Sequence, residues 1–143
     1  MRSVIEIAEY VIWYCSQQGF PISNLKLQKI LYFVQAEFLV SANCPCFFEE
    51  IKAWDFGPVI PEVYKKYKVY GGSNIPTLFI SNTIKIKENE MELINGIVDA
   101  CADYTASELV DITFNQSPWK DNYEAGRNNF IPLVEIKDYF SEF

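Results

Sequence analysis

The side chains that most often carry catalysis are sparse in this sequence. The 143-residue chain contains no histidine, so it lacks the commonest general base and metal ligand, and it cannot assemble a Ser-His-Asp or Cys-His arrangement by itself. Carboxylate pairs occur at Glu49-Glu50 and at Asp99 with Asp103, and glycosidase chemistry requires two carboxylates in one cleft with divergent pKa values. Asp99 and Asp103 share one face of a predicted helix, which indicates a solvated acidic surface. We therefore expect no catalytic residues and no enzyme; a hydrolase or transferase would instead show a cleft holding a strongly perturbed acid.

The four cysteines offer little for metal or redox chemistry. Cys44-Pro45-Cys46 could provide half of a zinc site, but structural zinc sites use a second matched pair, which this sequence lacks. Cys15 and Cys101 fall within helical patterns and are predicted to be small core residues. We expect no metal and no cofactor.

Charge restricts the partners of this protein. Acidic residues outnumber basic ones by 19 to 12, for a net charge of −7. Nucleic-acid binding draws much of its affinity from basic residues that neutralise phosphates, so we expect no nucleic acid as the main ligand, and an acidic surface favours a basic protein partner. No apolar run approaches the length of about 20 residues that spans a bilayer, and the first residues lack the pattern of a secretory signal. We therefore expect a soluble, cytoplasmic protein without a membrane partner; a homo-oligomer is compatible with the sequence.

The chain is organised around the segment from residue 24 to residue 64. Its first part, NLKLQKILYFVQAEFLV at 24–40, predicts an amphipathic helix. The apolar stripe of this helix consists of Leu27, Ile30, Leu31, Val34 and Phe38. The polar residues predicted on its other sides are Lys26, Gln28, Lys29, Gln35 and Glu37.

Capping residues and helix breakers delimit the other helices. Ser3 with Glu6 predicts a capping box at the start of the first helix, and Gly19 predicts a left-handed end. The short loop to the next helix predicts that the two helices pack antiparallel. Further helices are predicted from Pro61 to Gly71, from Asn89 (capped with Glu92) to about Tyr104, from Thr105 (capped with Glu108) to Ile112, and from Pro132 or Leu133 onward.

A small β element completes the predicted fold. Thr83–Lys87 alternates polar and apolar residues, as a half-buried strand does, and we expect it to pair with the segment from Glu49 to Trp54. Asp55–Pro58 is predicted to be a turn, and residues 114–129 an irregular loop. Because no repeat or linker divides the chain, we expect residues 1–143 to form a single domain. The predicted fold is mainly α with a minor α+β character, a compact helical domain of about five to six helices with a small two-stranded β element.

Four separate motifs resemble those of one known family. They are NLKLQKILYFVQ at 24–35, AWDFGPVIPEVY at 53–64, Ser107-Glu108-Leu109, and SPWKDNY at 117–123. In this order and spacing they resemble the Panacea domain family, which includes phage-associated GepA-like proteins and SocA-like antitoxins. The resemblance runs from about residue 4 to residue 140. The chain departs from the family pattern at Thr113-Phe114, where members commonly have Thr-His.

The resemblance implies a non-enzymatic protein-binding module of prophages and other mobile elements. Members of the family act as antitoxins that neutralise diverse toxins by binding them, and one branch acts as an adaptor that delivers a toxin to a bacterial protease. For this chain the resemblance implies a cytoplasmic, all-α antitoxin of a toxin–antitoxin system. The alternative is a proteolytic adaptor, or another phage–host interaction protein, without a toxin partner.

The motifs also supply candidate partner contacts, for which the sequence leaves alternatives open. Gln28, Lys29 and Tyr32 either form a polar platform that grips a partner segment, or hold the corner at residues 54–58 in place. Trp119 either fills the core or meets a partner, since tryptophan and tyrosine are enriched in interface hot spots. The candidate partner-binding residues are Gln28, Lys29, Tyr32, Trp54, Gly57, Pro58, Tyr64, Pro118 and Trp119.

Overall fold

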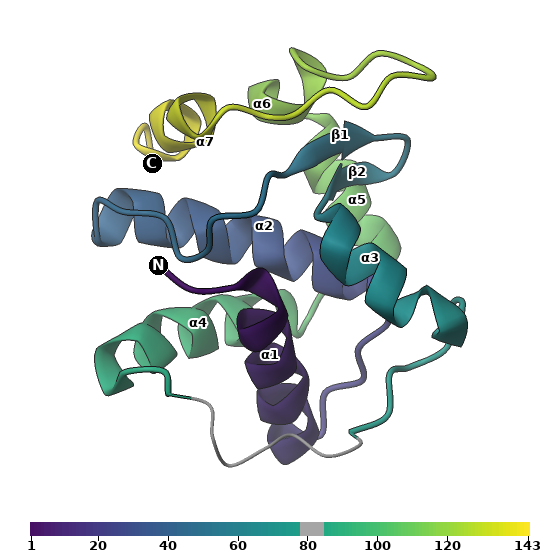
Figure 1. Ribbon diagram of the computed structural model, residues 1–143, viewed down its shortest axis with the longest axis vertical. Coiled ribbons are helices and arrows are strands. Elements are labelled where there is room, and N and C mark those ends of the chain that lie inside the picture. Colours follow the sequence, from purple (N-terminus) through teal and green to yellow (C-terminus); the bar gives the residue numbers. More distant parts are fainter. Residues whose placement is uncertain (78–84) are drawn as a thin grey trace.

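The computed structural model describes residues 1–77 and 85–143. The predicted fold, mainly α with a small two-stranded β element, is confirmed (Figure 1). Within these ranges, the helices are too short or too polar to cross a membrane. The elements in chain order are α1 (Val4–Gln18), α2 (Asn24–Ser41), β1 (Lys52–Trp54), β2 (Gly57–Val59), α3 (Pro61–Tyr67), the 3-10 helix η1 (Lys68–Tyr70), α4 (Glu88–Cys101), α5 (Ala106–Phe114), α6 (Ser117–Lys120) and α7 (Leu133–Phe140).

Helix α2 is the centre of the fold. Figure 1 shows it running through the middle of the molecule, with α1 and α4 on one side and β1, α6 and α7 on the other. It contacts α1, α3, α4, α5, α7 and β2, and its predicted apolar stripe is buried. The predicted placement of its polar residues was wrong for Gln28, Lys29 and Gln35, which are only 1%, 0% and 0% exposed. Packing on nearly all sides leaves this helix little solvent-facing surface.

Helix α1 begins and ends where the sequence predicts. The Ser3 hydroxyl accepts a hydrogen bond from the N–H of Ile5 at 3.3 Å, and Gly19 adopts φ 75°, a conformation that glycine tolerates without steric cost. Glu49, rather than the predicted Glu6, completes the cap, because Glu49 Oε1 accepts the N–H of Val4 at 2.9 Å. A contact between segments distant in sequence therefore replaces the local one.

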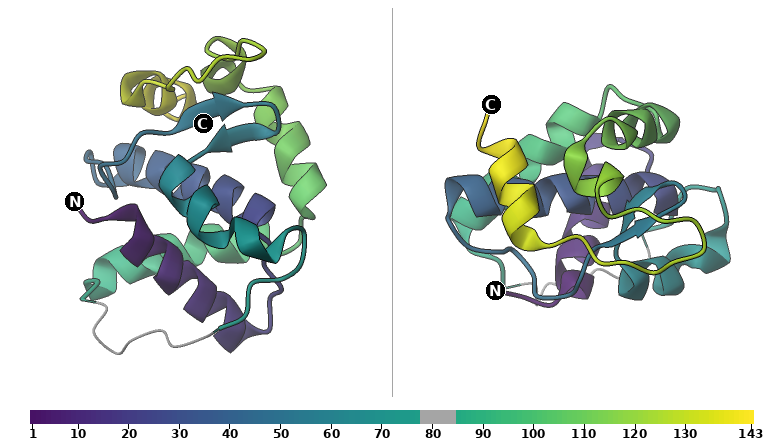
Figure 2. Two further views of the ribbon diagram at one scale, coloured as in Figure 1. Left: turned by 45° about the vertical axis from the view of Figure 1, so that its right-hand side comes forward. Right: turned by 90° about the horizontal axis from the view of Figure 1, so that it is seen from above.

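Helices α1 and α2 do not pack antiparallel as predicted. Figures 1 and 2 show them crossing steeply. The loop between them is held in an extended path, since the N–H of Ile75 donates to the carbonyl of Ile22 at 2.8 Å and Ser23 forms a β-bridge with Asn74. This path sets the direction in which α2 begins.

The two later caps illustrate one correct and one wrong prediction. At α5 the predicted capping box is confirmed: Thr105 Oγ1 accepts the N–H of Glu108 at 3.1 Å, and Glu108 Oε1 accepts the N–H of Thr105 at 2.8 Å. At α4 the cap is formed by Glu90, whose Oε1 accepts the N–H of Lys87 at 3.1 Å, and not by Asn89 with Glu92. Helix α4 therefore begins at Glu88, and it ends at Cys101 rather than near residue 104.

The β element is a hairpin of β1 and β2, whose register pairs Lys52 with Val59 and Trp54 with Gly57. The predicted pairing of β1 with Thr83–Lys87 is corrected: residues 83 and 84 lie outside the described ranges, and residues 85–87 belong to no strand. The other neighbour of β1 is the segment 129–131, which is joined by backbone hydrogen bonds of 2.9 Å to Ala53 in β1 and of 2.7 Å to Ile51 just before it. Residues 57–59, predicted in part as a turn, form the second strand.

The segment 114–129, predicted to be irregular throughout, contains the short helix α6. Pro118 stands in its first turn, where a missing N–H costs nothing. The chain then returns past β1 and enters α7 at Leu133, as predicted. The hairpin, α3 and the 126–128 segment come together beside the start of α2, and this is where the site lies.

Candidate functional site

A row of buried polar residues runs along α2. Asn24, Gln28, Tyr32 and Gln35 follow one another at spacings of four, four and three residues, which places them on one helix face. Each is hydrogen-bonded, as buried polar groups must be. Most of their partners lie in the loops and helix starts around α2, and Asn24 bonds the carbonyl of Tyr64 in α3, so this row ties the surrounding segments to the central helix.

Two neighbouring side chains of α2 close the outer edge of the hairpin. Lys29 Nζ donates to the carbonyl of Pro58 at 3.1 Å, and Gln28 Oε1 accepts the N–H of Ile60 at 2.9 Å. Pro58 has no N–H to offer a further strand. Gln28 and Lys29 thus bond backbone groups that a third strand would otherwise bond.

The same row secures two other segments. Gln35 Nε2 donates to the carbonyl of Phe47 at 2.9 Å, while Gln35 Oε1 accepts the backbone N–H groups of Cys46 and Phe47 at 2.7 and 3.3 Å. The Tyr32 hydroxyl donates to Gln116 Oε1 at 2.8 Å. The buried thiol of Cys46 is therefore part of a packed corner, whereas Cys44 is exposed.

Lys29 is a fully buried amine beneath a glycine. Burial lowers the pKa of the Lys29 amine to about 7, because the charged form is poorly solvated there. It forms none of the ion pairs found among the described residues. Gly57 adopts φ 100°, and a Cβ at this position would lie 2.7 Å from both Lys29 Cε and Thr113 Oγ1. The hairpin can approach α2 this closely only because residue 57 is glycine.

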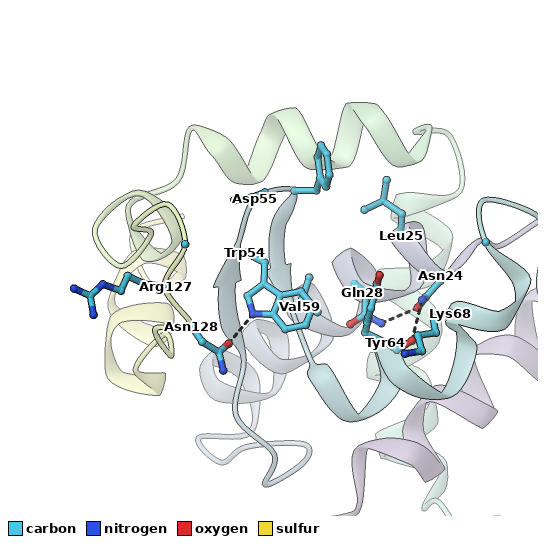
Figure 3. A pocket seen from close by; sticks show the side chains of 13 residues that line it. Asn24, Leu25, Gln28, Trp54, Asp55, Val59, Tyr64, Lys68, Arg127 and Asn128 are labelled. Atoms are coloured by element: carbon cyan, nitrogen blue, oxygen red, sulfur yellow. Dashed lines mark hydrogen bonds between the residues drawn. The ribbon is translucent and has the colours of Figure 1, made fainter.

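An open groove lies beside this corner, with a volume of about 540 Å³. Its walls come from the start of α2, the hairpin, α3 and the loop before α7 (Figure 3). Phe56, Tyr64, Lys68 and Asn128 are exposed along it, whereas Gln28 is buried. The lining residues are Asn24, Leu25, Gln28, Trp54, Asp55, Phe56, Val59, Tyr64, Lys68, Gly71, Gly126, Arg127 and Asn128.

Trp54 is held in the groove from two directions. Its indole N–H donates to Asn128 Oδ1 at 2.8 Å (Figure 3), and its ring meets that of Tyr64 edge-on, with 5.3 Å between centroids. Trp119 supports it from behind, because the Trp119 indole N–H donates to the carbonyl of Trp54 at 2.8 Å. The Trp119 ring lies against Phe114 and stacks on Tyr123, with centroid distances of 4.6 Å to each.

The structure brings together only some of the sequence-predicted candidates. Gln28, Trp54 and Tyr64 line the groove. Lys29 and Tyr32 have no exposed surface, and their hydrogen bonds agree with the alternative in which these residues hold the fold. Gly57, Pro58 and Pro118 are also buried, and Trp119 is partly buried. A direct partner contact by any of these residues stays a prediction.

Sequence reasoning missed ten of the thirteen residues that line the groove, and three of them show why. Phe56 occupies the tip of the hairpin and is 66% exposed. A large apolar residue within a turn is the sequence signal that could have identified Phe56 as a contact residue. Asn24 is the first residue of α2, a position where a polar residue ordinarily indicates helix capping and not a groove. Asn128 is brought to Trp54 by the tertiary fold from 74 residues away, and nothing in the local sequence indicates this contact.

In the described part of the chain, no group of three or more Cys, Asp or Glu residues could hold a metal ion.

The fold and its groove define a mainly helical module with a β-hairpin held against its central helix. Residues 27–120, well over half of the chain, match the family described as Antitoxin SocA-like, Panacea domain, and the chain belongs to this family. Over 65 residues it is 45% identical to a curated protein named Antitoxin SocA, from Caulobacter vibrioides (strain NA1000 / CB15N). That match covers 46% of this chain and 32% of the relative, so the chain aligns with about a third of that protein. No solved structure matches the chain.

Proposed function

We propose that this chain is an antitoxin-type module that neutralises a partner toxin by binding it directly, without chemistry of its own. The observation that carries the proposal is the open groove beside the hairpin, in a chain that belongs to an antitoxin family. The name of the curated relative, Antitoxin SocA, supports the same role.

The groove has the composition of a protein-binding surface. Trp54, Phe56 and Tyr64 present large aromatic rings there, and aromatic residues dominate interface hot spots because they bury much area at a low entropic cost. The hydrogen bonds of Asn128 and Trp119 hold Trp54 before any partner arrives. Such preorganisation reduces the free energy lost on binding.

The most perturbed amine in the described chain supports a non-enzymatic role. Lys29, whose pKa is lowered to about 7, would be a candidate base or nucleophile if a substrate could reach it. Its side chain is 0% exposed and is bonded to the carbonyl of Pro58. We therefore assign Lys29 to the support of the hairpin.

Overall charge favours a basic toxin. A net charge of −7 attracts a basic partner and accelerates its encounter, an effect that salt screens. We infer that the acidic surface guides the toxin and that the groove forms the specific contact.

Co-expression with the toxic product of a neighbouring reading frame tests this proposal. The wild-type chain should restore growth, and Phe56→Glu should abolish the rescue because it places a charge at the hairpin tip. The matched control is Val134→Glu on α7, since Val134 is 63% exposed and lies outside the groove lining. Failure of the wild-type chain to restore growth would contradict the proposal. Co-purification of a host protease component without any toxin would support the proteolytic adaptor instead.

A further inference from the structure

The hydrogen-bonding groups of the groove identify the kind of segment that it accepts. We propose that the groove binds an extended segment of the partner protein in which a Glu or Asp side chain lies next to a large apolar side chain. This inference rests on the proposed function, and it adds the chemistry of the contact.

Three amide side chains in the groove have orientations that their partners determine. A backbone or indole N–H can only donate, so Gln28 must turn Oε1 toward the N–H of Ile60, and Asn128 must turn Oδ1 toward the indole of Trp54. Gln28 Nε2 then donates to Asn24 Oδ1 at 2.9 Å, and Asn24 Nδ2 donates to the carbonyl of Tyr64 at 3.2 Å (Figure 3).

In this network each amide oxygen accepts one hydrogen bond, while several amide hydrogens have no acceptor. Each amide nitrogen carries two hydrogens. One on Gln28, one on Asn24 and both on Asn128 have no acceptor among residues 1–77 and 85–143. Gln28 is buried, so its remaining N–H depends on whatever occupies the groove. A ligand that supplies oxygen acceptors can therefore pair with these remaining hydrogens.

Charge at the α3 end of the groove agrees with this polarity. Lys68 is exposed and forms no ion pair with a described residue. Asp55, the acidic residue of the lining, already accepts a 2.6 Å hydrogen bond from the hydroxyl of Tyr123. The side chain of Arg127 points away from the groove (Figure 3). Asp55 keeps its negative charge at the hairpin turn, so the charge that favours a carboxylate is that of Lys68, at the end of the groove near Asn24 (Figure 3).

The rest of the groove is apolar, which sets the second requirement. Trp54, Val59, Leu25 and Phe56 line this part, and burying a large apolar side chain there is favourable. Small molecules prefer enclosed pockets that cover most of their surface. Phe56, Tyr64 and Lys68 stand exposed along the walls, and such an open groove suits an extended peptide.

This inference is tested by selecting peptides that bind the immobilised full chain from a phage-displayed library of random short peptides. Peptides that also bind the Phe56→Glu variant are discarded. The remaining peptides should combine Glu or Asp with Phe, Trp or Leu. A synthetic peptide from this set should lose about two- to fivefold in affinity when its acid is replaced by the amide, as expected for an exposed charged contact.

Two lysines of neighbouring turns provide matched variants. Lys68→Met should weaken binding of the acidic peptide by about two- to fivefold and leave the amide peptide unaffected, because only the ion pair is removed. Lys65→Met removes a lysine outside the groove lining and should change neither affinity. Selected peptides without acids, or equal binding of the acid and amide forms, would overturn the inference.

The two proposals fail separately. Toxin rescue together with a groove that has no preference for acids would overturn the carboxylate inference alone. Acid-dependent peptide binding without any toxin rescue would support the groove chemistry and contradict the antitoxin role.

Discussion

Lys29 lies directly beneath Gly57, so that a Cβ on Gly57 would be 2.7 Å from Lys29 Cε. The relationship joins the central helix to the hairpin at its tightest point, where Lys29 also donates to the carbonyl of Pro58. The position of the groove depends on this contact, because the strand that Lys29 holds carries one wall of the groove.

Gly57→Ala should destabilise the protein by about 3 kcal/mol or more, since alanine would be held at an unfavourable positive φ and its methyl group would meet two buried side chains. Urea unfolding followed by circular dichroism measures the loss. Gly126→Ala is the matched control, because Gly126 also has a positive φ, 76°, but its Cβ would meet nothing within 4 Å; we expect a cost of about 1 kcal/mol. Equal costs at the two sites would contradict the close approach.

Titration of the Lys29 amine should raise the free energy of unfolding by about 2 kcal/mol between about pH 6.5 and 8.5. Its pKa is about 7 in the folded protein and ordinarily 10.5. Above pH 7 the unfolded chain therefore binds more protons than the folded one, so stability increases with pH. Burial raises the pKa values of three thiols, whose ordinary value is 9.0, so their opposite effect on stability begins near the upper end of this range and grows above it.

Lys29→Met provides the control for that pH dependence. The variant should lose the rise in stability attributable to the amine, while the remaining groups titrate as before. Urea unfolding of both proteins across the same pH range gives the comparison. Parallel curves for the two proteins would show that Lys29 is not the titrating group.

The Tyr32–Gln116 hydrogen bond should contribute measurably to stability. Tyr32→Phe removes the donor and leaves the buried Gln116 Oε1 unpaired, which costs about 1–2 kcal/mol. In a double-mutant cycle with Gln116→Leu we expect a coupling of about 1 kcal/mol. Additive effects would contradict a direct bond between these side chains.

Phe56→Glu should leave stability within about 0.5 kcal/mol of the wild-type value, because the side chain is 66% exposed. Thermal unfolding of the purified variant checks this. A strongly destabilised variant would mean that loss of toxin neutralisation reports on folding and not on the groove.

Much of the helical framework could be predicted from local signals. The stripe of Leu27, Ile30 and Val34 is buried as its spacing indicates, and the Thr105–Glu108 capping box forms as expected. These features depend on residues within one or two turns of each other, which a sequence pattern reports directly.

The buried polar row could not be predicted in the same way. Hydrophobic periodicity assigns Gln28 and Lys29 to solvent, but the hairpin and α3 cover that face of α2. The second strand was missed because Gly57 and Pro58 are typical of turns, whereas here Gln28 and Lys29 bond the strand edge. Both errors come from tertiary contacts that override local preference.

The candidate site was partly predictable for a related reason. Trp54 and Tyr64 belong to one motif and do line the groove. Asn128 and the support from Trp119 reach Trp54 only through the folded chain. Phe56 belongs to the same motif, but a turn pattern alone does not indicate whether an apolar residue at its tip is buried or exposed.

A crystal structure of the chain bound to the toxin of its neighbouring reading frame tests the central claim most directly. The account predicts that a toxin segment fills the groove and removes Trp54, Phe56 and Tyr64 from solvent. A complex in which the toxin binds elsewhere and the groove stays open would contradict it.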